Sequence, residues 1–83
     1  MILDILTPDV KVFSGEVYAV NLPGVQGFFE VLDKHAALVS NLEKGYITIR
    51  KTAKDEEKIM IEGGLVEVLN NKVVVLADSV IKG

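Results

Sequence analysis

Apolar and polar side chains alternate with a period of two along most of this chain. In the run 73–78, the side chains of Val73, Val75 and Ala77 would all face one side of a strand. Shorter runs of the same kind are 46–50, 59–61 and 65–69. Because successive side chains of a β-strand point to opposite faces, this pattern predicts strands with one buried face. Over Val73–Leu76 both sets are apolar, so we expect that strand to be covered on both faces or to meet a partner.

Turn-forming residues separate the predicted strands at short intervals. The signals are Thr7–Asp9, Ser14-Gly15, Pro23-Gly24, Lys44-Gly45, Gly63-Gly64 and Asn70-Asn71. Proline presets one turn dihedral, whereas Gly and Asn accept a positive φ. We expect a two-residue hairpin turn at Asn70-Asn71, a charged hairpin loop over Lys51–Lys58, and a short helical turn near Asp33–Leu38. Many short strands at this spacing predict an all-β sandwich or barrel.

Composition narrows the class of protein without naming a function. Eighty-three residues predict one domain, 1–83, and an apolar content of 49% is enough to fill one core. The absence of cysteine excludes disulfides and thiolate chemistry. A net charge of −3 with interspersed signs offers no basic patch for nucleic acid. Apolar runs fall far short of the ~20 residues that a membrane-spanning helix needs.

The composition of the segment Leu22–Leu42 resembles that of a functional site, but the segment lacks the residues that catalysis requires. Its single histidine, His35, has Asp33 two positions away and Ser40 five, and neither spacing implies a catalytic triad. One histidine without cysteine is also a poor zinc-ligand set. A phosphate loop would need a helix and a Lys-Ser/Thr pair after its glycines. We therefore predict no catalytic, metal, cofactor or ATP site, and disfavour a small hydrolase or metal enzyme around His35.

Two adjacent phenylalanines make the same segment a candidate protein contact. Phe28 and Phe29 would place one ring on each face of a strand, and one ring is expected in the core. The other is either a second core contact or an exposed anchor, since aromatic residues concentrate at interface centres. The residues alone thus predict a small all-β protein-binding module without an active site.

Ordered motifs along the whole chain add a family resemblance. They are Leu3–Pro8, Val12–Val17, Leu22–Gly24, Gly27, His35-Ala36, Leu38, Gly45, Glu62–Val68 and Val73–Ser79. In this order and spacing they resemble the N-terminal β-sandwich domain of the epsilon subunit of F-type ATP synthase, called delta in mitochondria. The resemblance implies a ten-stranded β-sandwich of two five-stranded sheets.

The resemblance also implies a role. A member of this family is a non-catalytic central-stalk subunit that binds the gamma subunit and the c-ring and couples proton-driven rotation to ATP synthesis. It would lie at the cytoplasmic face of the bacterial inner membrane, held there by its partners. The implied c-ring contacts are Gln26, Phe28, Glu30 and Asp33, and the implied gamma contacts are Thr7, His35, Ala36, Leu38 and Ser40. C-ring loops in this family commonly carry an arginine, with which Glu30 or Asp33 could pair. The alternative is a free-standing all-β adaptor that uses the same surface.

The chain departs from the family pattern in the loop and at its end. Asp33-Lys34 stand where the family has Pro-Gly, and Phe28 stands where it often has glutamate. Glu30 and Ala37 replace a family glycine and proline. The sequence ends at Ala77–Gly83, where many relatives begin a C-terminal helical hairpin that regulates hydrolysis. We expect a naturally short form without that hairpin.

Overall fold

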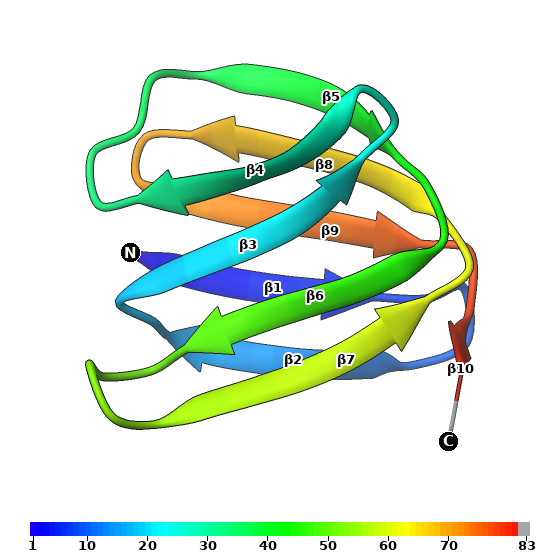
Figure 1. Ribbon diagram of the computed structural model, residues 1–83, viewed down its shortest axis with the longest axis horizontal. Coiled ribbons are helices and arrows are strands. Elements are labelled where there is room, and N and C mark those ends of the chain that lie inside the picture. The colour runs from blue at the N-terminus through cyan, green and yellow to red at the C-terminus, as the bar shows by residue number, and fades with distance from the viewer. Residues whose placement is uncertain (82–83) are drawn as a thin grey trace.

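The computed structural model describes residues 1–81, which form ten β-strands and no helix (Figure 1). The strands are β1 (Ile2–Leu6), β2 (Lys11–Glu16), β3 (Ala19–Gly24), β4 (Gly27–Leu32), β5 (Leu38–Leu42), β6 (Gly45–Arg50), β7 (Glu56–Ile61), β8 (Gly64–Leu69), β9 (Lys72–Ala77) and β10 (Val80–Ile81). Residues 82–83, the last two of the segment at which relatives begin a helical hairpin, lie outside the described residues.

The strands form two layers of five. One layer has the order β4-β3-β6-β7-β10 and the other β5-β8-β9-β1-β2. In Figure 1, β3, β6 and β7 pass in front of β9, β1 and β2. Neighbouring strands are antiparallel except β1 and β9, which run parallel. The ten-stranded all-β prediction is confirmed, with one refinement: the pair Gly24 and Leu42 joins the layers into one curled sheet.

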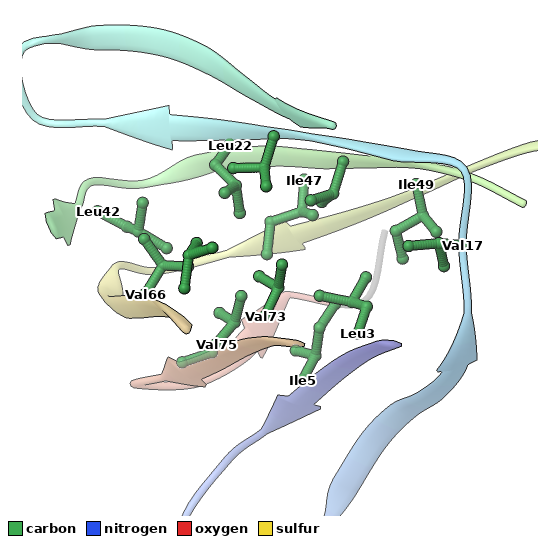
Figure 2. Close-up of a cluster of buried hydrophobic side chains, with 14 of the residues drawn as sticks. Leu3, Ile5, Val17, Leu22, Leu42, Ile47, Ile49, Val66, Val73 and Val75 are labelled. Atoms are coloured by element: carbon green, nitrogen blue, oxygen red, sulfur yellow. The ribbon is translucent and has the colours of Figure 1, made fainter. Parts of the chain in front are cut away.

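The core lies between the layers and comes from one side of each alternating strand. Val73, Val75 and Ala77 are all buried, as their spacing predicts. Figure 2 shows Leu3 of β1 and Val73 of β9 pointing toward Ile47 of β6 across the interior. Burying a Leu, Ile or Val side chain contributes about 1.5–3 kcal/mol each, so this shared layer of side chains holds the two halves together.

The turn predictions have mixed outcomes. At Asn70 and Asn71 the φ angles are +51° and +62°, and Leu69 pairs with Lys72, which confirms the two-residue hairpin. Positive φ at both positions is the signature of a type I′ turn. The charged loop is shorter than predicted because β7 begins at Glu56, whose side chain lies 3.6 Å from Arg50.

The helical turn predicted near Asp33–Leu38 is wrong. Lys34 adopts a φ of +64°, which is incompatible with a right-handed helix, and β5 begins at Leu38. The main-chain N–H of His35 donates to the carbonyl of Leu32 at 3.1 Å, so the chain makes a single tight turn there. Lys34 thus takes the left-handed conformation that suits the glycine found at this position in the resembled family.

Candidate docking surfaces

The turn between β3 and β4 presents an aromatic ring to solvent. Phe28 is 66% exposed, whereas Phe29 packs against the core. A side chain at Gly24 would lie 2.9 Å from Cε1 of the Phe29 ring, so the inner ring rests directly on the opposite strand. The adjoining Gln26 is exposed. One ring therefore faces inward and the other outward, and Phe28 is free to contact another molecule.

The outer face of the second layer carries a broad apolar area. Leu65 of β8 lies opposite Leu76 of β9, which lies opposite Leu6 of β1, so three leucines form one row across the sheet. Leu76 is 50% exposed and the nearby Val39 is 65% exposed. We call this area the apolar face, and it consists of Ile2, Leu6, Val39, Leu65, Leu69, Val74 and Leu76.

A fixed carboxylate interrupts the apolar face. The Ser14 hydroxyl donates to Asp4 Oδ1 at 2.7 Å, and Lys72 Nζ lies 3.7 Å from Asp4 Oδ2. The Ser14 hydrogen bond is the main cause that holds the pKa of Asp4 below its ordinary value of 3.8, with the charges of Lys11 and Lys72 adding to it. Because Asp4 is already partnered within the chain, it does not prevent an apolar partner from covering this face.

At the end of the sandwich away from the β3–β4 turn, one side chain joins the β4–β5 loop to the β8–β9 turn. Asn71, in the β8–β9 turn, donates to Asp33 Oδ1 at 2.8 Å and accepts from the main-chain N–H of Lys34 at 2.7 Å. The amino group of Met1 lies 3.2 Å from the same Asp33 oxygen. In Figure 1, the β4–β5 loop and the β8–β9 turn lie near the N-terminus.

Neither a cluster of metal-ligating side chains nor a membrane-spanning helix is found among residues 1–81. Within 1–81, no group of three or more His, Cys, Asp or Glu side chains is arranged to hold a metal ion. None of these residues belongs to a helix with the length and apolar character needed to cross a membrane.

Residues 1–83 match the family described as the ATP synthase Delta/Epsilon chain, beta-sandwich domain. The chain belongs to this family. It is 43% identical over 79 residues to the ATP synthase epsilon chain of Sulfurimonas denitrificans, covering 95% of this chain and 61% of that protein. It is 41% identical over 78 residues to the ATP synthase epsilon chain of Chlorobium limicola, covering 94% of this chain and 89% of that protein. The chain thus spans less than two thirds of the first relative and most of the second.

Solved structures share the delta/epsilon fold with this chain. A chain in a cryo-EM structure of the Euglena gracilis mitochondrial ATP synthase matches with a TM-score of 0.90 at 22% identity, covering 98% of this chain and 52% of that one. A chain from the Tetrahymena thermophila mitochondrial ATP synthase matches with a TM-score of 0.84 at 15% identity, covering 98% and 65%. At these identities the likeness shows the fold alone.

Strand β4 separates the residues that the epsilon resemblance implies for the c-ring. Gln26 and Phe28 lie together at the β3–β4 turn, and Glu30 follows Phe28 on the same outward side of β4. Asp33 lies beyond the other end of β4, where its carboxylate contacts Asn71. The structure therefore brings three of these four residues along one strand and leaves Asp33 with partners inside the chain.

The residues that the resemblance implies for gamma are more widely dispersed. Thr7 begins the connection between β1 and β2, where its hydroxyl accepts from the main-chain N–H of Val10 at 3.2 Å. His35 and Ala36 lie in the β4–β5 loop, with His35 Nδ1 2.7 Å from the Ala36 carbonyl oxygen. The remaining two, Leu38 and Ser40, lie on β5 opposite buried Val68 and Val66 and so face inward.

Most of the apolar face was not predicted as a site from the sequence. The available signal was the run Val73–Leu76, whose two apolar sets predicted a second covered face or a partner. Leu76 belongs to the outward set, and its register brings Leu65 and Leu6 beside it. These neighbours come from strands distant in sequence. The apolar face therefore could not be predicted without knowing that β1 and β8 both pair with β9.

Acid should weaken the link at Asp33. The hydrogen bond from Asn71, followed by that from the amino terminus, holds the pKa of Asp33 below its ordinary value of 3.8. A carboxyl with a lowered folded-state pKa stabilises the fold above the unfolded-state pKa, and this stabilisation is lost as the pH falls through the folded-state pKa. We expect wild type to lose free energy of unfolding relative to Asp33→Asn between about pH 7 and about pH 3 in urea titrations. A difference that stays constant over this range would contradict the expectation.

Proposed function

We propose that this chain is a non-catalytic central-stalk subunit of a proton-translocating F-type ATP synthase. It binds the gamma subunit and the c-ring, so that rotation of the ring reaches the catalytic head. The observation that carries the proposal is the family match over residues 1–83, with relatives named ATP synthase epsilon chain. The matching structures contain, by their titles, a c-ring and, in one case, a central stalk.

The apolar face is the proposed dock for gamma. A row of three leucines outside the core stays in water unless a partner covers it, and burial of apolar area contributes about 25 cal/mol per Å². Thr7 follows Leu6 directly at the edge of this row and is a proposed gamma contact. His35 and Ala36 of the β4–β5 loop complete the proposed gamma set, whereas Leu38 and Ser40 face inward and are left out of it.

The β3–β4 turn is the proposed contact with the c-ring. Phe28 supplies an exposed apolar anchor, and Gln26 lies beside it. Glu30 is the proposed acidic contact for an arginine of the ring, whereas Asp33, whose carboxylate contacts Asn71 at the far end of β4, is left out of this contact. An exposed ion pair of this kind would add only ~0.2–1 kcal/mol, so it serves register and orientation more than affinity. Held by both partners, the subunit is peripheral to the membrane, at the cytoplasmic face of the bacterial inner membrane.

Co-purification with partners tests the proposal. Tagged wild-type chain should capture gamma together with the c-ring from solubilised membranes. Leu76→Glu places an unpaired charge in the gamma dock and should weaken capture of gamma by at least about 30-fold, because desolvating that charge costs more than about 2 kcal/mol. The matched control is Tyr18→Glu, which alters an exposed aromatic residue in the β2–β3 connection. Failure of the wild-type chain to capture either subunit would favour the free-standing adaptor.

A further inference from the structure

One carboxamide joins the β4–β5 loop to the β8–β9 turn, just beyond the end of the β5–β8 ladder. Asn71 uses both polar atoms of its side chain on the β4–β5 loop, donating to Asp33 and accepting from the Lys34 main chain. Its main-chain carbonyl accepts from the N–H of Ile2 at 3.2 Å. A single residue of the second layer therefore contacts the loop that leads from β4 to β5 and the start of β1.

The turn that contains Asn71 does not itself require this side chain. Asn70 and Asn71 both have positive φ, a conformation that glycine adopts at no steric cost. The Asn71 carboxamide makes its two hydrogen bonds to the loop, 37 and 38 residues away in the chain. The Asn71 carboxamide therefore stabilises the β4–β5 loop rather than the hairpin that contains Asn71.

Without the Asn71 contacts, we expect the β4–β5 loop to be more mobile. Lys34 holds a φ of +64°, a conformation that is unfavourable for a residue with a Cβ. Between β4 and β5 the described main-chain hydrogen bond is that from His35 to Leu32. The Asn71 contacts at 2.7 and 2.8 Å fix the two residues that immediately precede His35 and Ala36.

We propose that Asn71 is a positioning residue that preorders the β4–β5 loop for the rotor partner. The inference rests on the proposed function, because it assigns to the loop the contacts of His35 and Ala36 with gamma. A loop already held in its bound conformation loses less conformational entropy on association, so the bond within the chain raises affinity without touching the partner. Asn71 acts through Asp33 and Lys34 and stays out of the interface.

Two glycine variants of the same turn separate positioning from folding. Asn71→Gly removes the carboxamide and leaves Asn-Gly, the sequence that a type I′ turn most prefers, so the hairpin should remain intact. Asn70→Gly is the matched control, since it changes the neighbouring turn residue and retains the carboxamide. Hydrogen exchange is measured at the Lys34 amide, and affinity is measured for the purified gamma–c-ring complex.

We expect Asn71→Gly to speed exchange of the Lys34 amide at least about fivefold and to weaken binding about fivefold to tenfold. Its thermal midpoint should fall only slightly below that of Asn70→Gly, because two hydrogen bonds to the loop are lost while a preferred Asn-Gly turn is gained. Asn70→Gly should match wild type in both measurements. Faster exchange at Lys34 with unchanged affinity would overturn the positioning role. If wild type itself fails to bind the complex, the proposed function fails, and that result is distinct because it precedes any comparison of variants.

Discussion

Gly64→Ala is expected to destabilise the domain by about 3–5 kcal/mol, a large part of the ~5–15 kcal/mol typical of a small domain. Gly64 begins β8 with a φ of +155°, which side chains rarely adopt. A Cβ there would overlap the carbonyl oxygen of Leu76 and lie 3.0 Å from Cα of Ala77. Both are main-chain atoms of the neighbouring β9, so they cannot move aside as a flexible side chain could. Overpacking of about 1–3 kcal/mol adds to backbone strain of a similar size.

Gly27→Ala is the matched control for Gly64→Ala. Gly27 also has a positive φ, +123°, but a Cβ built on it meets no heavy atom within 4 Å. Only backbone strain then remains, and we expect a loss of about 1–2 kcal/mol. Urea unfolding of the two variants gives the comparison directly. Equal losses would mean that the close approach of β9 to Gly64 adds no cost.

Phe28→Ala is expected to weaken binding to the c-ring about 30-fold with little change in stability. An aromatic anchor at the centre of an interface typically contributes about 2 kcal/mol or more when truncated, and 2 kcal/mol corresponds to about 30-fold in affinity. Phe28 is 66% exposed in the free chain, so its removal takes little from the core. Free energy of unfolding should therefore remain within about 0.5 kcal/mol of wild type. Affinity for the solubilised ring and urea unfolding are the two measurements.

Tyr18→Ala controls for the loss of any exposed aromatic ring. Tyr18 is 58% exposed in the β2–β3 connection, outside the β3–β4 turn and outside the apolar face. The Tyr18→Ala variant should bind the c-ring as wild type does. Similar weakening in both variants would indicate nonspecific adhesion of aromatic side chains and would remove Phe28 from the proposed interface.

Local pattern predicted much of the fold because burial follows strand alternation. The period of two at Val73, Val75 and Ala77 identified the inward side of β9, and Asn70-Asn71 identified the turn before it. Local pattern could not predict contacts between segments that are distant in sequence. The pair Gly24 and Leu42, which makes one curled sheet of two layers, depends on where β5 crosses relative to β3.

The candidate contact residues lie farther apart in the structure than their spacing in the sequence suggests. Gln26, Phe28 and Asp33 are close in sequence and so resemble one contact segment. At about 3.3 Å per residue, β4 carries the chain roughly 17 Å between Phe28 and Asp33. The contact of Asp33 with Asn71 carries no signature in the sequence around either residue, because the two lie 38 positions apart.

The parallel pairing of β1 with β9 has a consequence for synthesis of the chain. Ile2 lies opposite Lys72, so β1 leaves the ribosome well before β9, which is one of its two neighbours. Until then β1, which carries the fully buried Leu3 and Ile5, lacks its ladder partner on one side, and its layer stays incomplete. Pairings between such distant segments are slow to form and leave apolar surface exposed meanwhile. A ribosome that stalls before Lys72 should therefore hold a nascent chain that is open to chaperones and proteases.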